Sequence, residues 1–287
     1  MYSVDLVSDL HIDQWDPKLP NLYPCGKIKN FPMEWECIDK SPYLIVAGDV
    51  SDDLDLTLSY LNDVSKHYKK ILFVDGNHEH SHKFPQLWEE SVIQEKLNKI
   101  GNAKLVYLPN KPHIIDGVAY VGMCGWWDYF QEKKYLQNDL DYFKSWRSNF
   151  GIQDSKNFID NVRNKAREQV EKMKSWIQKF HRSSNVHTII LVTHTVPSIK
   201  FSNYHRTQVN SLYSELLDLT PKLKFWCFGH THQQWDKQNQ LDEIKNKEIV
   251  KNKETEKSIR FISNPRGRPE DYDREKYQVK SLYLSKL

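Results

Sequence analysis

The sequence predicts an α/β protein in which helices connect parallel strands. Two continuous apolar runs of the buried-strand type lie at 43–47 and 70–74. Between them, residues 54–68 place apolar side chains at the spacing of one helical face. A helix that returns the chain to a second buried strand indicates a parallel crossover, which is typical of the α/β class.

The rest of the chain extends this pattern. Apolar runs predict further strands at 3–8, 104–108, 118–124, 186–193, 224–228, 259–263 and 281–284. Apolar spacings of three and four predict a long helix over 158–180, and further helices are expected within 86–100, which Gly101-Asn102 closes, and at 211–219. The region 131–182 is polar and helical, and no linker-like composition marks a boundary. We therefore expect one domain over residues 1–287 with a helical insertion at about 131–182, whose apolar stripe packs against a sheet.

Composition narrows the class of protein. A hydrophobic content of 39% with 28% charged residues is typical of a soluble globular protein, and the net charge of +3 gives no overall basic field for nucleic acid. The four cysteines show no Cys-x-x-Cys spacing, which favours reduced thiols. No signal-peptide pattern is present, and the longest aliphatic run, 189–192, is too short to span a bilayer. We expect a cytoplasmic protein without a membrane partner.

Polar side chains stand at the ends of five predicted strands. Carboxylates, imidazoles and one amide occur there: Asp9, His11, Asp49, Asn77, His78, His194, His230 and His232. In α/β sheets, ligands bind at the carboxyl ends of the strands, so these side chains can share one crevice. A single strand-end Asp or His is usually a cap or a satisfied polar group. The same residue types at five strand ends indicate a metal site instead.

The ligand types indicate which metals would suit this site. Carboxylate, imidazole and amide ligands without a thiolate suit Mn²⁺, Fe²⁺ or Zn²⁺ rather than a structural, cysteine-bound zinc. Leaving out one side chain of the adjacent pair Asn77-His78, seven ligands remain, which exceeds the needs of one ion that also keeps water. Two ions that share one carboxylate would use them all.

The order of these residues resembles the calcineurin-like metallophosphoesterase superfamily. The resemblance rests on the blocks Asp9-Leu10-His11, Gly48-Asp49, Gly76-Asn77-His78-Glu79, His194 and Gly229-His230-Thr231-His232. No metal-ligand position of the family pattern is missing between residues 9 and 232. The resemblance implies a four-layer α/β/β/α sandwich of two mixed β-sheets flanked by helices.

The resemblance also implies a role for each ligand. Two divalent ions would be held by Asp9, His11 and His232, by Asn77, His194 and His230, and by a bridging Asp49. Manganese is the expected metal, with iron, zinc and nickel as alternatives. The implied reaction is hydrolysis of a phosphomonoester or phosphodiester by a hydroxide that bridges the two ions. The partner would be a small phosphorylated molecule, with a nucleotide as one option.

His78 is implied to act on the substrate rather than on a metal. In the family this histidine contacts the scissile phosphate or protonates the leaving oxygen. Its imidazole then needs a partner that keeps it oriented. Asp52, three residues after the bridging carboxylate, is the candidate for this catalytic pair, and Asp53 and Glu79 are the alternatives.

Two further residues are candidates for substrate binding. Arg266 lies in an Asn-Pro-Arg-Gly stretch that resembles one found in bacterial members, and its guanidinium could hold a phosphate in a bidentate pair. A structural turn is the alternative there. Trp127, with Trp126 and Tyr129, could stack on a base, although packing is favoured.

Two other functions would suit the same fold. A nuclease of the superfamily would need a basic groove, which a charge of +3 does not indicate. A non-catalytic protein-interaction scaffold would be expected to have lost metal ligands, and none is missing here.

Overall fold

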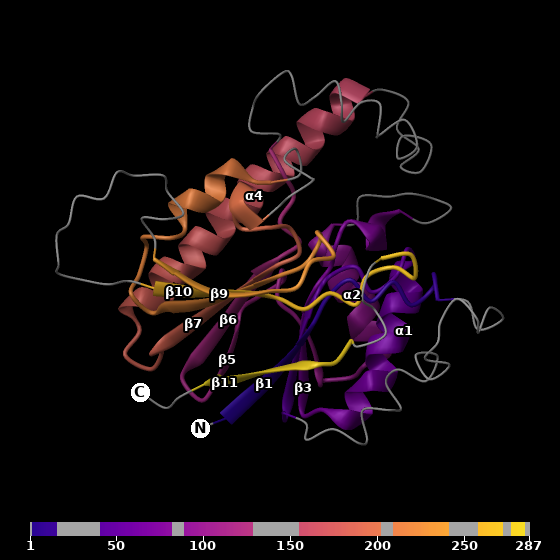
Figure 1. Ribbon diagram of the computed structural model, residues 1–287, viewed down its shortest axis with the longest axis horizontal. Coiled ribbons are helices and arrows are strands. Elements are labelled where there is room, and N and C mark those ends of the chain that lie inside the picture. The colour runs from indigo at the N-terminus through magenta and orange to yellow at the C-terminus, as the bar shows by residue number, and fades with distance from the viewer. Residues whose placement is uncertain are drawn as a thin grey trace.

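Two β-sheets face each other in the computed structural model, with helices on their outer faces (Figure 1). The structure describes residues 2–15, 41–81, 89–128, 155–201, 209–240, 258–271 and 277–284. The α/β class and the two mixed sheets flanked by helices are therefore confirmed.

The first sheet contains five strands in the order β11-β1-β2-β3-β4. Their bounds are Tyr2–Val7 for β1, Tyr43–Ala47 for β2, Lys70–Val74 for β3, Leu105–Tyr107 for β4 and Lys280–Leu284 for β11. The strands from β1 to β4 pair in parallel, as the predicted crossovers require, whereas β11 runs antiparallel to β1.

The second sheet contains six strands in the order β5-β6-β7-β8-β10-β9. Their bounds are His113–Ile115 for β5, Val118–Met123 for β6, Thr188–Thr193 for β7, Leu223–Phe228 for β8, Trp235–Gln240 for β9 and Ser258–Ser263 for β10. The inner four strands are parallel, and β5 and β9 form antiparallel edges. The edges β5 and β9 were not predicted, because β5 has three residues and β9 is polar.

Helices cover the outer face of each sheet (Figure 1). The long helices are α1 at Leu54–Val64, α2 at Glu90–Ile100 and α4 at Ser155–Arg182. Short 3₁₀ turns occur as η3 at Ser65–His67, η4 at His78–His80, η6 at Ile199–Phe201 and η7 at Ser211–Glu215. The helix expected at 211–219 is thus only a short 3₁₀ segment followed by a turn. No helix in these described ranges is long and apolar enough to cross a membrane.

Three layers of apolar side chains hold the sandwich together. Leu6, Ile45 and Leu72 of the first sheet meet Tyr120 and Ile190 of the second, and all five are fully buried. Fully burying one such side chain stabilises the fold by about 1.5–3 kcal/mol. This central layer fixes the two sheets face to face.

The helix α4 packs by the predicted stripe. Val170, Met173 and Ile177 are buried in the layer between this helix and the second sheet, and Val162 and Ala166 of the same stripe are also fully buried. The helix lies within the expected insertion, whose first part, 131–154, is outside the described residues. The stripe therefore has the packing role that its spacing predicts.

The two sheets are also joined by backbone hydrogen bonds just beyond their strands. The backbone N–H of Ser8 donates to the carbonyl of Asn264, and the N–H of Arg266 donates to the carbonyl of Ser8. Within the first sheet the N–H of Asp9 donates to the carbonyl of Gly48, and within the second sheet that of Gly229 donates to the carbonyl of His194. These bonds bring the loops that follow the strands to one edge of the sandwich.

Candidate metal centre

Asp9, His11 and His232 form a first group of ligands. The loop after β1 carries Asp9 and His11, and the loop after β8 carries His232. One ligand atom from each lies within 4.8 Å of those of the others. The Nε2 atoms of His11 and His232 are 3.0 Å apart, and His232 Nε2 is 3.7 Å from Asp9 Oδ1. Three potential ligands thus point at one small volume.

Asp49, His194 and His230 form a second group of ligands with the same compactness. His194 Nε2 lies 3.0 Å from Asp49 Oδ2, 3.0 Å from Asn77 Oδ1 and 3.2 Å from His230 Nδ1. One ring nitrogen can satisfy only one of these three neighbours with its single proton. The convergence of four polar atoms suits a cation.

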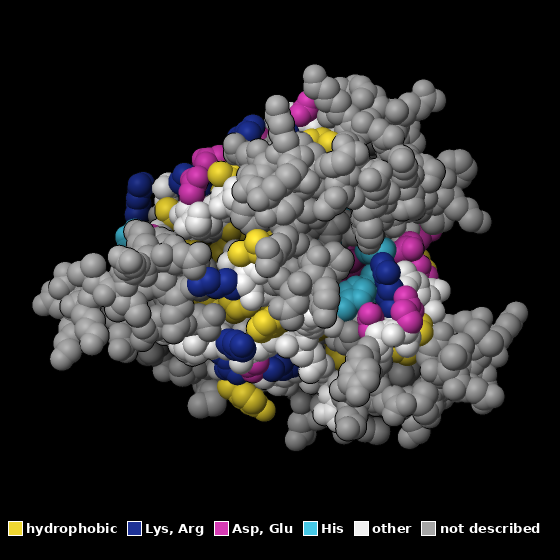
Figure 2. All heavy atoms as spheres, turned by 45° about the horizontal axis from the view of Figure 1, so that its top comes forward, with side chains coloured by type: hydrophobic (Ala, Val, Ile, Leu, Met, Phe, Trp, Pro, Cys, Tyr) yellow, Lys and Arg dark blue, Asp and Glu magenta, His cyan; other side chains and the backbone are white. Residues whose placement is uncertain are grey.

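Asp49 belongs to the second group and lies near His78. Its Oδ2 is 3.0 Å from His194 Nε2 and 3.9 Å from His78 Nε2. Its Oδ1 also accepts a hydrogen bond from the backbone N–H of His78 at 2.9 Å. Figure 2 shows histidine side chains gathered on one face of the molecule beside acidic and basic ones.

The backbone of the site is held in an unusual conformation. Of the six non-glycine residues with positive φ in the described ranges, five are proposed ligands: Asp9, His11, Asp49, His230 and His232. Their φ values lie between 42° and 74°, where residues with a Cβ are uncommon. Backbone strain of this kind persists only where the surrounding structure holds it in place, and it is found most often at functional sites.

Unsatisfied polar atoms support the fit to a cation. Asp9 is fully buried, and its Oδ2 has no hydrogen-bond partner among the described residues. Burying a carboxylate oxygen without a partner is costly, and a bound cation would remove that cost. The residues present therefore fit the metals that the sequence predicts.

The charges of the site depend on one another. Burial opposes ionisation of Asp49, but the His194 and His78 imidazoles hold the pKa of its carboxyl well below the usual range. Burial also disfavours the charged form of His194, yet Asp49 raises its pKa to about 10. For His11, burial and the nearby His78 lower the pKa well below the usual value, which favours the neutral form that binds metals.

Hydrogen bonds from outside the ligand set orient two of the histidines. His194 Nδ1 is 2.9 Å from the carbonyl oxygen of Ala47, and His232 Nδ1 is 2.6 Å from Asp271 Oδ2. In each case the bond leaves Nε2 to face the other ligands. Such partners fix the tautomer and orientation of metal-binding imidazoles. The sequence does not indicate this role for Asp271, because Asp271 does not directly follow an apolar run that predicts a strand.

The structure brings Asp52 to His78. Asp52 Oδ1 is 2.6 Å from His78 Nδ1, whereas the side chain of Asp53 caps helix α1 by accepting from two backbone N–H groups. Asp53 is therefore occupied at the helix terminus. The orienting role of Asp52 stays a prediction that this geometry supports.

Glu79 holds the loops of the site together. Its buried carboxylate accepts hydrogen bonds from the backbone N–H groups of Gly76, Asp49 and Val50 at 2.7–3.1 Å. Burial and the neighbouring Asp49 raise its pKa to about 7. Glu79 thus links the turn after β2 to the turn after β3, and its contacts differ from those of an orienting partner of His78.

The two predicted substrate-binding residues are buried. The Arg266 guanidinium lies 4.0 Å from the centre of the Trp15 ring, and only 2% of the residue is exposed. Trp127 is fully buried, with its ring centroid 5.8 Å from that of His230. Tyr129 lies outside the described residues. These contacts favour packing, and the guanidinium that does reach His78 belongs to Arg268, with one nitrogen 3.1 Å from His78 Nε2.

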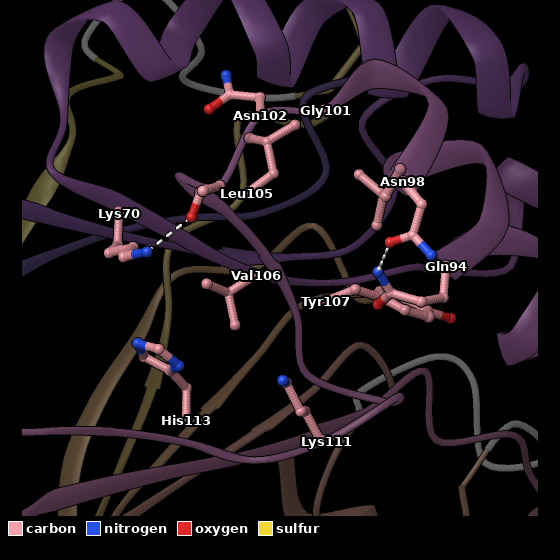
Figure 3. Close-up of a pocket in the computed structure, with 12 residues that line it drawn as sticks. Lys70, Gln94, Asn98, Gly101, Asn102, Leu105, Val106, Tyr107, Lys111 and His113 are labelled. Atoms are coloured by element: carbon pink, nitrogen blue, oxygen red, sulfur yellow. Dashed lines mark hydrogen bonds between the residues drawn. The ribbon is translucent and has the colours of Figure 1, made fainter.

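A separate pocket of about 400 Å³ lies beside α2, β4 and β5 (Figure 3). No proposed metal ligand lines it. Two of its polar side chains are already bonded nearby, because Lys70 donates to the carbonyl of Ala103 at 2.6 Å and Gln94 donates to Asn98 at 2.9 Å. The candidate metal centre is therefore not this pocket.

Comparison with known proteins agrees with the resemblance. A family model described as calcineurin-like phosphoesterase matches residues 2–234. A search of curated proteins gives no match. The fold is similar to the crystal structure of phosphopantetheinyl hydrolase (PptH) from Mycobacterium tuberculosis, with a TM-score of 0.66, 16% identity and coverage of 99% of this chain and 96% of that chain. The calcineurin-like phosphoesterase YfkN from Bacillus subtilis matches at a TM-score of 0.42 and 15% identity, over 91% of this chain and 80% of that chain.

Proposed function

Because this chain belongs to the calcineurin-like phosphoesterase family, we propose that it is a dinuclear metal-dependent hydrolase of phosphomonoester or phosphodiester bonds. The observation that carries the proposal is that two compact ligand groups lie next to each other, with the backbone N–H of His230 in the second donating to Asp9 Oδ1 of the first at 2.7 Å. The positive φ values of five proposed ligands also support it, because such strained backbone persists only where the surrounding fold holds it in place.

In this proposal each ligand group holds one ion. Asp9, His11 and His232 would bind the first, Asn77, His194 and His230 the second, and Asp49 both. Manganese is the proposed metal, and iron, zinc or nickel are the alternatives for these ligands. Two such ions, when bound, act as Lewis acids on phosphoryl oxygens and lower the pKa of a water molecule to supply a nucleophile.

In this proposal His78 donates a proton to the leaving group. Its Nδ1 is held by Asp52 at 2.6 Å, and its Nε2 is 3.9 Å from Asp49 Oδ2, next to the ligand groups. The pKa of His78 is raised: burial lowers it, but the carboxylates of Asp49 and Asp52 outweigh burial. A protonated imidazole at this place can donate a proton to the departing oxygen.

The proposed substrate is a small phosphorylated molecule, with a nucleotide as one option. The similar solved structure carries a name that describes hydrolysis of a phosphopantetheinyl group, and a phosphate ester of that kind is a further candidate to screen. We also propose a cytoplasmic location, which the buried free thiols of Cys124 and Cys227 support.

A substrate screen tests the proposal. Metal-free protein is supplemented with Mn²⁺ and assayed on an aryl phosphate, a bis-aryl phosphate and an alkyl pyrophosphate. We expect turnover of at least one of the three, abolished by a chelator and restored by Mn²⁺. Turnover that is indifferent to chelation, or none with any of the four candidate metals, would contradict the proposal.

A further inference from the structure

The turn formed by residues 268–271 contacts the candidate metal centre in two places. It lies beyond the region that the family model matches, which ends at residue 234. Asp271 contacts the ligand His232, and Arg268 contacts His78. Building on the proposed function, we propose that Arg268 binds a non-bridging oxygen of the substrate phosphate beside His78.

The backbone of Arg268 is fixed relative to the ligands. Asp271 Oδ2 accepts a hydrogen bond from the backbone N–H of Arg268 at 2.6 Å, and the N–H of Asp271 donates to the Arg268 carbonyl at 3.0 Å. The same Asp271 oxygen lies 2.6 Å from His232 Nδ1. One carboxylate thus links the position of Arg268 to that of a proposed metal ligand.

The Arg268 guanidinium is directed at the atom of His78 that would meet the substrate. One terminal nitrogen lies 3.1 Å from His78 Nε2, and the Nε atom is buried without a hydrogen-bond partner among the described residues. A guanidinium only donates, and a protonated His78 also donates from Nε2, so in that state neither can accept from the other. A phosphate oxygen at this place would accept from it, and paired N–H groups match phosphate geometry.

The charged residues around Arg268 have other partners, which leaves the Arg268 guanidinium able to bind an anion. Two carboxylates of this region already have partners, because Asp52 is bonded to His78 and Asp271 to His232. Two other arginines of this region are engaged elsewhere: Arg260 forms a two-point ion pair with Asp236 at 2.7 and 2.9 Å, and Arg266 stacks on Trp15. Within the described ranges, Arg268 forms no ion pair.

Phosphate binding tests this proposal without relying on turnover. The dissociation constant of inorganic phosphate is measured by calorimetry on Mn²⁺-loaded wild-type protein and on Arg268→Gln. We expect binding about 10- to 100-fold weaker in the variant, since a hydrogen bond from a charged donor is lost. KM for an aryl phosphate should rise by a similar factor. Equal phosphate affinity in both proteins would overturn the proposal.

Arg260→Gln is the matched control, because it removes the same charge away from the candidate centre. We expect its phosphate affinity to stay within about twofold of wild type, since long-range charge effects are screened by salt. If thermal denaturation shows that the Arg268→Gln variant does not fold, the Arg268→Met variant is measured in its place, with the same expected loss of phosphate affinity. If the protein hydrolyses an ester but binds phosphate equally well with and without Arg268, only this inference is wrong. If phosphate binding depends on Arg268 but no ester is hydrolysed, only the proposed function is wrong.

Discussion

Replacing Asp52 by Asn removes a negative charge beside His78 and keeps a side chain of the same size. The carboxylate oxygen lies 2.6 Å from His78 Nδ1, a distance typical of a strong, charge-assisted hydrogen bond. Such a bond is worth about 1.5–3 kcal/mol. The Asp52 side chain is 40% exposed, so solvent screening reduces this to about 1–2 kcal/mol. We therefore expect turnover to fall by about 5- to 30-fold.

The assay separates orientation of His78 from damage to the metal centre. Turnover number and KM are measured with aryl phosphates whose leaving groups differ in pKa, and bound metal is measured alongside. The loss should be larger for poor leaving groups, because these need the proton most. Metal content should be unchanged, because Asp52 is not a proposed ligand.

Asp53→Asn is the control for this prediction. Its side chain caps helix α1, and Asn caps a helix about as well as Asp. The control should therefore keep wild-type turnover and stability. Wild-type turnover in Asp52→Asn would refute the orienting role, and so would an equal loss with good and poor leaving groups.

Three further variants examine other parts of the site. His78→Ala should retain both metals and lose turnover by about 10²- to 10⁴-fold on poor leaving groups; an equal loss on good ones in steady-state kinetics would remove its proton-donor role. Asp271→Asn should weaken metal binding by about 10- to 100-fold because the His232 imidazole loses its orienting partner, and an unchanged metal titration would contradict this. Glu79→Ala should lower the free energy of unfolding by at least about 2 kcal/mol, since buried N–H groups of Gly76 and Val50 lose their acceptor; denaturation at the wild-type midpoint would show that water replaces it.

Local sequence signals were sufficient to predict most of the strands and to select the proposed ligands. Each proposed ligand follows a short apolar run, and strand ends are visible wherever such a run stops. The α4 stripe is equally local, since Val170, Met173 and Ile177 repeat at the spacing of one helical face. These predictions needed no knowledge of which strands pair.

Contacts that depend on the assembled fold could not be predicted. Asp271 meets His232 across 39 residues, and Arg268 meets His78 across 190, with no periodicity to indicate either contact. Arg266, the arginine that the sequence suggested for phosphate binding, lies two positions before Arg268, and the structure packs it against Trp15 while Arg268 contacts His78. The edge strand β9 was missed because its residues are polar and an edge needs no apolar pattern.

The metal content of Asp49→Asn tests the central claim most directly. Asp116→Asn is its control, because Asp116 is also an aspartate with positive φ, 48° against 55°, on an exposed turn. Element analysis of protein saturated with Mn²⁺ should give two ions per chain in the wild type and in the control. Asp49→Asn should bind one ion or none and hydrolyse no aryl phosphate. Two ions in Asp49→Asn, or one in the wild type, would contradict a dinuclear centre bridged by Asp49.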